Sequence, residues 1–148
     1  MSEEYPGAYR YKQLVQAKLF IDSHYSERID IENIANQAYF SKFHFLRRFK
    51  AVYGKTPHQY LTAVRIEKAR ESLGKGLSVQ ESCYQVGFES ITTFIGLFKR
   101  YEKCTPGEYR QRIQRKKQEI KIRPLKFIPN CFAEQKGWNK MSNIEEVI

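Results

Sequence analysis

Two stretches of the chain follow one pattern: IDIENIANQAYFSKFHFLRRFKAVYGKTPHQYL at residues 29–61 and LSVQESCYQVGFESITTFIGLFKRYEKCTPGEYR at residues 77–110. Matching residues lie 48 positions apart up to Phe40 and Phe88, and 49 positions apart from Ser41 and Ser90 onward. One extra residue in the turn after Phe88 explains the change of spacing. So many matches with one single-residue shift indicate two copies of one structural unit.

Each copy predicts a short helix, a tight turn and a longer helix. Residues that cap helix N-termini stand at the expected starts, at Asp30, Ser41, Thr56, Ser78 and Ser90. Helical periodicity over residues 9–25 predicts one more helix before the first copy. We therefore expect an all-α chain with seven helices before Arg115 and no strands.

The repeat also predicts the domain organisation. A first helix-turn-helix lobe spans residues 9–61, and a long linker helix over residues 57–73 joins it to a second lobe at 74–114. At a rise of 1.5 Å per residue, the linker helix is about 25 Å long and sets the distance between the lobes. Residues 115–148 form a basic C-terminal extension that we expect to be irregular.

Charge and composition limit the partners and the compartment. The chain has 26 Lys and Arg against 16 Asp and Glu, a net charge of +10, which favours a polyanionic partner such as nucleic acid or an anionic membrane. Three widely spaced cysteines exclude a disulfide scaffold and suit a reducing compartment. No apolar run approaches the ~18 residues of a membrane span, and the N-terminus lacks signal-peptide features. We therefore expect a cytoplasmic protein without a membrane partner.

The two longer helices, residues 42–53 and 91–101, each have one face for the core and one for a ligand. In a helix-turn-helix the longer helix is the recognition helix, which enters the DNA major groove. By helical spacing, the expected buried side chains are Phe45, Phe49 and Val52 in the first recognition helix and Phe94, Leu97, Phe98 and Tyr101 in the second.

The outward face of the first recognition helix carries Phe43, Arg47 and Lys50, with His44 and Leu46 at its edges. Arg47 can bind the O6 and N7 atoms of a guanine, and Phe43 or Leu46 can contact a thymine methyl group. Arg48 lies to one side, where a phosphate is the expected contact. Two alternatives stay open: the cations could form an ordinary solvated face, and Phe43 could pack into the core of its own lobe.

The outward face of the second recognition helix differs in chemistry. It carries Thr92, Thr93, Gly96 and Lys99, with Ile95 at its edge, and it has no arginine. Gly96 costs about 1 kcal/mol in a helix interior. It also permits close approach of the backbone to DNA or to a neighbouring helix. We expect the two lobes to be unequal readers of sequence.

The motifs IANQAYFSKFHFLRRFKAVYGKTPHQYLTAVRIEKARESL and QVGFESITTFIGLFKRYEKCTPGEYR make the chain resemble, over roughly residues 9–112, the DNA-binding domain of the AraC/XylS family of bacterial transcription regulators. The resemblance implies two homeodomain-like helix-turn-helix lobes with recognition helices in successive major grooves on one side of the duplex. Carried over by position, the base-facing residues are Phe43, Leu46, Arg47, Ile91, Thr92, Thr93 and Gly96. Candidate contacts to the DNA backbone are Ser41, Lys42, His44, Arg48, Lys50, Ser90, Lys99 and Arg100. Gly96 departs from the family, which often has an arginine or another polar residue there.

The resemblance implies a sequence-specific regulator of transcription that binds double-stranded DNA, an activator rather than a repressor, which also contacts RNA polymerase. Two recognition helices in one chain suit a monomer on DNA. No separate ligand-binding domain is visible. The chain is either a freestanding regulator, which its Met-Ser start and its tail favour, or the end of a longer one.

Three other classes of function fit the sequence less well. An enzyme is not expected, because the chain has no phosphate loop, nucleophile elbow or acid pair, and His24, His44 and His58 lack metal-ligand spacing. We therefore expect no cofactor and no metal.

A module that binds proteins or membranes could use the basic run at residues 110–126 and the aromatic residues of the tail, Phe127, Phe132 and Trp138, but this function would leave the repeat unexplained. A nonspecific nucleic-acid binder fits the charge but does not need paired recognition helices.

Overall fold

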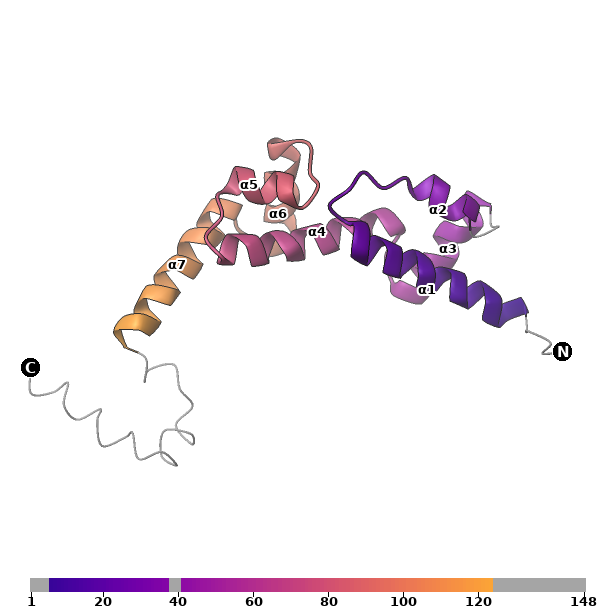
Figure 1. Cartoon of the computed structure of the whole chain (residues 1–148), viewed down its shortest axis with the longest axis horizontal. Helices are drawn as coiled ribbons and strands as arrows, with labels where there is room; N and C mark the ends of the chain where they lie inside the picture. The colour runs from indigo at the N-terminus through magenta and orange to yellow at the C-terminus, as the bar shows by residue number, and fades with distance from the viewer. Residues whose placement is uncertain (1–5, 38–40, 124–148) are drawn as a thin grey trace, which may run out of the picture. The chain divides into compact units, whose positions relative to one another are not determined.

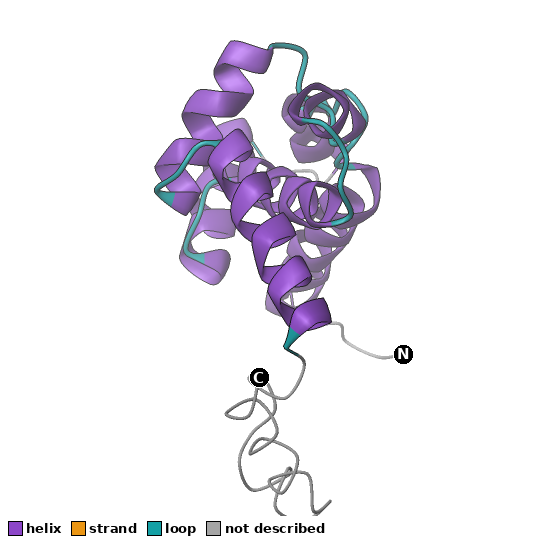
Figure 2. Ribbon diagram, turned by 90° about the vertical axis from the view of Figure 1, so that its left-hand side faces the viewer, coloured by secondary structure: helices purple, strands orange, loops and turns teal. Residues whose placement is uncertain are grey.

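The computed structural model describes residues 6–37 and 41–123, and these ranges contain seven helices (Figure 1). The helices are α1 (Pro6–His24), α2 (Ile31–Gln37), α3 (Lys42–Tyr53), α4 (Pro57–Gly74), α5 (Val79–Gln85), α6 (Ile91–Glu102) and α7 (Pro106–Ile122). The described residues outside the helices are loops and turns, and no strand occurs among them (Figure 2). The expected all-α fold class, with two helix-turn-helix pairs on either side of a long helix, is confirmed.

The predicted caps define where the helices begin. A side-chain oxygen of Asp30 accepts hydrogen bonds from the first turn of α2, and Ser41 and Ser90 do the same for α3 and α6. Complete capping boxes start α4, with Thr56 and Gln59, and α5, with Ser78 and Glu81. Each cap satisfies backbone donors that a helix leaves open at its start, and the helix boundaries therefore follow the sequence closely.

The chain divides into two compact units, residues 1–106 and 107–148. The first unit holds α1 to α6. In the second, α7 continues to Ile122, so residues 115–122 of the extension are helical where we expected an irregular chain. Arg123 precedes Pro124, and a proline disfavours helical geometry for the residue before it, which ends α7. The remainder of the expected extension, with Phe127, Phe132 and Trp138, lies outside the described residues, as does Phe40.

The core of the first lobe joins one face from each of four helices. Its buried members are Leu14, Ala17, Ile21, Ile31, Ala35, Phe45, Phe49 and Leu61. The Phe49 ring packs against Tyr53 and Tyr60 at centroid distances of 4.7 and 5.8 Å. Val52 is 41% exposed, so the prediction that it is buried was wrong. It lies at the margin of the apolar stripe, near the C-terminal end of α3, where the lobe does not cover it.

The second lobe packs α5 and α6 against the second half of α4. Phe94 contacts Phe88 and Phe98 at centroid distances of 5.3 and 5.7 Å, and Phe94 and Phe98 are fully buried as predicted. Leu97 is only half-buried and Tyr101 is 38% exposed, which corrects two of the expected core positions. Both lie on the flank of the stripe, beside the groove that separates α6 from the start of α4.

A polar cluster ties α1 to α4 at the edge of the first core. The Tyr60 hydroxyl donates a hydrogen bond to Asp22 at 2.5 Å, and the Lys18 ammonium binds the other oxygen of Asp22 at 2.8 Å. The same ammonium lies 5.5 Å from the centre of the Tyr60 ring. Burial, followed by the hydrogen bond to Asp22, raises the pKa of Tyr60, and the hydroxyl therefore keeps its proton to higher pH.

Candidate nucleic-acid interface

The recognition helix α3 is oriented by what it buries. Phe45 and Phe49 are fully buried in the first core, and the opposite face of the helix is therefore turned outward. Phe43, on that outward face, is 72% exposed. It does not pack into the core of its lobe, which settles one of the two alternatives left open by the sequence. A phenylalanine this exposed beside cations offers an apolar contact to a ligand.

Arg47 lies one turn after Phe43 on the same exposed face. Its Nε group donates to the Phe43 carbonyl at 3.4 Å, and no carboxylate of the described chain forms an ion pair with it. The terminal guanidinium nitrogens are thus available to an external acceptor. Lys42 differs, because its ammonium is ion-paired with Glu32 of α2. Arg48 and Lys50 are exposed, on either side of the buried Phe49.

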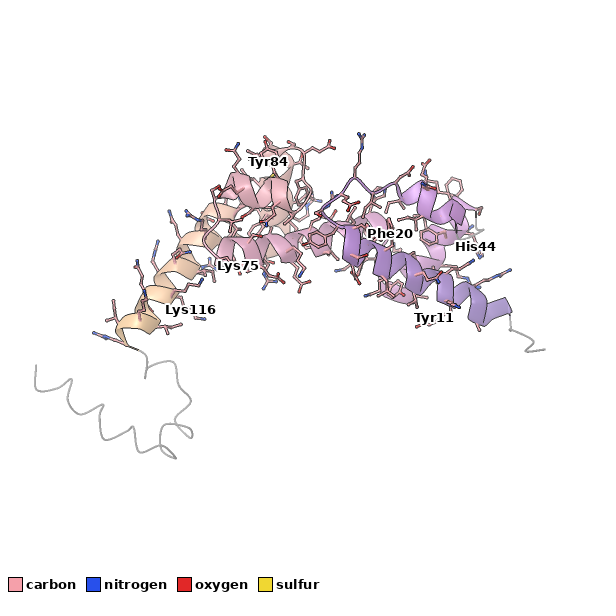
Figure 3. The ribbon with its side chains drawn as sticks, in the orientation of Figure 1. Tyr11, Phe20, His44, Lys75, Tyr84 and Lys116 are labelled. Atoms are coloured by element: carbon pink, nitrogen blue, oxygen red, sulfur yellow. The ribbon has the colours of Figure 1, made fainter. Side chains whose placement is uncertain are left out.

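The remaining α3 candidates are partly engaged within the lobe. Ser41 is exposed, and its hydroxyl oxygen accepts a hydrogen bond from the backbone of His44 at 3.3 Å as the N-cap of α3. His44, marked in Figure 3, is half-buried. Leu46 is also half-buried and packs against the first core. Leu46 can therefore present only part of its side chain to a ligand.

The recognition helix α6 presents its matching face. Ser90 caps the helix, accepting from the backbone of Thr93 at 3.3 Å. The exposed residues after it are Thr92, Thr93, Gly96, Lys99 and Arg100, whereas Ile91 and Ile95 are half-buried. A methyl group added at Gly96 would meet no described atom within 4 Å. Close packing against a helix of the described chain therefore does not explain this glycine.

A groove beside α6 adds two polar residues, Lys55 and His58, that the sequence did not mark as DNA contacts. This open groove of about 620 Å³ is lined, among others, by Lys55 just before α4, by His58 in the first turn of α4, and by Arg100 of α6, an expected contact to the DNA backbone. Lys55 and His58 are exposed. They belong to the first copy of the repeat and Arg100 to the second, so neither copy read alone could reveal that they lie together. The one local sign of this groove in the sequence is a basic residue, Lys55, directly after Gly54, where α3 ends.

Residues 6–37 and 41–123 give little support for a metal site, a reactive cysteine or a membrane-spanning helix. No group of three or more His, Cys, Asp and Glu in these ranges could hold a metal ion. Cys83 is fully buried, and burial raises the pKa of its thiol, which suits a small core residue. In the same ranges, no helix combines the length and the apolar character needed to cross a membrane.

Comparison with known proteins decides the family. A family model for a helix-turn-helix domain, of the AraC/XylS type, matches residues 34–112, more than half of the chain. The chain belongs to the AraC/XylS helix-turn-helix family. The match includes both recognition helices and the linker helix α4. The family expected from the sequence motifs is therefore confirmed.

Relatives in the AraC/XylS-type family carry the names of transcription regulators. The MmsAB operon regulatory protein of Pseudomonas aeruginosa is 33% identical over 96 residues, which cover 64% of this chain and 31% of that protein. The HTH-type transcriptional regulator YdeC of Bacillus subtilis is 36% identical over 105 residues, which cover 70% of this chain and 35% of that protein. The chain thus spans about a third of the length of these relatives.

Solved AraC/XylS-type structures share the fold. The DNA-binding domain of AdpA, solved in complex with a target DNA, superposes with a TM-score of 0.64 at 30% identity, covering 76% of this chain and 97% of that one. The C-terminal domain of the response regulator YesN from Fusobacterium nucleatum superposes with a TM-score of 0.61 at 30% identity, covering 65% and 95%.

Proposed function

We propose that this chain is a sequence-specific regulator of transcription that inserts α3 and α6 into successive major grooves of double-stranded DNA. One observation carries the proposal: at matching positions of the repeat, α3 and α6 each bury two phenylalanines and expose the opposite face. An α-helix fits the major groove, where each base pair presents a distinct pattern of donors and acceptors. The family and the AdpA complex with DNA support this proposal.

The proposed roles of the exposed residues follow from their chemistry. On α3, Arg47 would bind a guanine while Phe43 and part of Leu46 contact thymine methyl groups. The proposed base-facing residues of α6 are Ile91, Thr92, Thr93 and Gly96. The proposed contacts to phosphates are Ser41, Lys42, His44, Arg48, Lys50, Ser90, Lys99 and Arg100. Phosphate contacts position the protein on the duplex without reading its sequence.

The proposal extends to how the regulator works. Two recognition helices in one chain support binding as a monomer. The name of the MmsAB operon regulatory protein supports control of an operon, and we infer an activator that contacts RNA polymerase and acts in the cytoplasm, where bacterial DNA lies. The expected lobes, residues 9–61 and 74–114 with the linker helix between them, are the proposed units of DNA contact. Residues 115–148 are a proposed basic extension, helical to Ile122.

A comparison of ligands tests the proposed class of function. The full chain should bind a 30-base-pair duplex pool and leave single-stranded RNA of the same length and vesicles of anionic lipid largely unbound at the same salt concentration. Equal affinity for the vesicles would support a membrane-surface module instead. Equal affinity for the RNA would support a nonspecific binder that follows phosphate charge.

Arg47→Ala should cost about 1–3 kcal/mol of binding free energy on the preferred duplex and relax the base preference under α3. The reason is the loss of a two-point hydrogen bond to one base. Arg48→Ala is the matched control, because Arg48 is an exposed neighbour with a proposed phosphate contact. It should weaken binding similarly on all sequences. Titrations on preferred and single-substituted duplexes, with thermal melts of both variants, measure these effects. An Arg47→Ala loss that appears in the melt rather than in base preference would contradict the assigned role.

Gly96→Ala tests whether Gly96 only weakens helix α6 or also lets the α6 backbone approach DNA closely. The added methyl group has open space, so the substitution should stabilise the fold by up to about 1 kcal/mol. If the α6 backbone approaches DNA closely, the same methyl group should weaken binding to the preferred duplex. Gly74→Ala, at the end of α4, also meets open space and should leave binding unchanged. A Gly96→Ala chain that is more stable and binds normally would refute the close approach.

A further inference from the structure

The two lobes contact each other directly where two connections meet. The turn between α5 and α6 packs against the connection between α1 and α2, and Figure 1 shows these two segments side by side. Gly87, in that turn, has φ +98°, a conformation that favours glycine. A Cβ atom at Gly87 would lie 2.9 Å from the carbonyl oxygens of Tyr25 and Ser26. The backbones of the two lobes thus meet with no room for a side chain.

Arg65 fastens the same junction from the middle of α4. Its guanidinium donates hydrogen bonds to the carbonyls of Tyr25, at 2.7 Å, and Glu27, at 2.9 Å, just past the end of α1. It also lies 5.6 Å from the centre of the Phe88 ring, next to Gly87. One planar cation therefore bonds to the first lobe and lies over an aromatic ring of the second. Burial lowers the pKa of Arg65, but an arginine remains charged throughout the physiological range.

We propose that Arg65, Gly87 and Phe88 form an inter-lobe clamp that holds α3 and α6 at one separation, so that the second lobe engages DNA as part of a rigid body. The inference rests on the proposed DNA-binding function. The linker helix α4 sets the distance along its own axis, and the clamp adds a second attachment away from that axis. A rigid connection raises the effective concentration of the second recognition helix once the first is bound. Arg65 is a positioning residue in this account and needs no contact with DNA.

Two variants loosen the clamp in different ways. Arg65→Lys keeps the charge but cannot present the planar fork that reaches both carbonyls. Gly87→Ala places a methyl group against the backbone of the first lobe. The matched controls are Lys68→Arg, a charge-preserving change on the same helix whose ion pair is with Glu71 of α4 itself, and Gly74→Ala, where an added methyl group meets nothing within 4 Å. Thermal melts establish the temperature at which each variant is folded. If Gly87→Ala does not fold, Arg65→Lys carries the comparison.

The first readout is the affinity of the full chain for two duplexes, the full preferred site and a duplex cut back to the half-site under α3. Loosening the clamp should weaken binding to the full site about tenfold, since it removes much of the advantage of tethering the second lobe. It should leave affinity for the half-site within about twofold, because the α3 contacts are unchanged. Both controls should bind both duplexes as the parent chain does.

The second readout needs no DNA. Asn33 of α2 and Gln80 of α5 are both exposed, and each can be replaced by an amino acid with a ketone side chain that couples to a nitroxide label. Double electron–electron resonance between the two labels then measures the distance between the lobes. The parent chain should give one narrow distribution, and Arg65→Lys and Gly87→Ala should broaden it. A distribution that stays narrow in both variants, or affinities for the two duplexes that fall by one common factor, would overturn the clamp. A parent chain without preference for any duplex would refute the proposed function, and the label distances would still decide the clamp.

Discussion

Raising the salt concentration from 50 to 200 mM should weaken binding of the preferred duplex on the order of 10³-fold. Five exposed cations on the recognition helices are proposed to neutralise phosphates: Lys42, Arg48, Lys50, Lys99 and Arg100. Each neutralised phosphate releases condensed counterions, and five contacts give a slope of about −4.5 in a plot of log affinity against log salt. Further contacts, for instance by Lys55, would steepen it. Titrations of one duplex at four or five salt concentrations measure the slope.

Charge variants identify where that slope originates. Lys99→Gln together with Arg100→Gln should reduce the slope by about two, because two phosphate contacts are lost. Lys75→Gln is the control, since Lys75 is exposed at the end of α4 and belongs to neither recognition helix (Figure 3). It should leave the slope unchanged. A slope near zero in the parent chain, or equal effects of Lys75 and of the α6 pair, would argue against these phosphate contacts.

Phe49→Ala should cost about 3–5 kcal/mol of unfolding free energy. The ring is fully buried among Phe45, Tyr53 and Tyr60, and its removal leaves a cavity where α3 packs on the lobe. A loss of this size is a large share of the about 5–15 kcal/mol that stabilises a typical domain. Urea denaturation followed by circular dichroism measures it, and the far-ultraviolet signal also shows whether the variant is folded without denaturant.

Phe43→Ala is the matched control on the same helix. The Phe43 side chain is mostly exposed, so its removal should change stability by no more than about 0.5 kcal/mol. It should instead weaken duplex binding, as expected of an apolar contact to DNA. If Phe43→Ala destabilised the fold as much as Phe49→Ala does, the assignment of the two faces of α3 would be wrong.

The helices and their starts could be predicted because the signals that set them are local. A serine or threonine hydroxyl reaches the backbone three residues on, so Ser41, Thr56, Ser78 and Ser90 announce helix starts without reference to the rest of the fold. The repeat then strengthens each assignment, since a pattern found in one copy recurs in the other. The fully buried phenylalanines of α3 and α6 follow from helical spacing in the same way.

The burial of residues at the edge of a helix face could not be predicted. Helical spacing gives the direction of a side chain around the helix axis, but it does not show how far the neighbouring helices extend to cover it. Val52 and Tyr101 fall within the apolar arc of their helices, yet both are exposed where their lobe ends. Phe43 posed the opposite problem, since its apolar character suits the core and only the structure shows it outside. The length of α7 was underestimated because a basic, weakly periodic run gives little evidence for a helix.

The junction between the lobes was beyond the sequence for a different reason. Arg65 bonds to carbonyls 38 and 40 residues earlier in the chain, and backbone acceptors leave no trace in the sequence. Gly87 stands next to Phe88, where a turn was expected, but its close approach to the backbone of Tyr25 and Ser26 depends on how the lobes meet. The fold of each lobe could be predicted from its own copy of the repeat, whereas the contact between the lobes could not be predicted from either copy.

Selection of bound duplexes from a random pool by the full chain is the most direct test of the central claim. The account predicts a two-part site whose halves lie about one helical turn apart, 10–10.5 base pairs between centres. The half under α3 should be sharply defined, with a guanine that loses its preference in Arg47→Ala, and the half under α6 should be more degenerate. A pool that shows no enrichment, or a site whose sharper half persists unchanged in Arg47→Ala, would contradict sequence reading by α3.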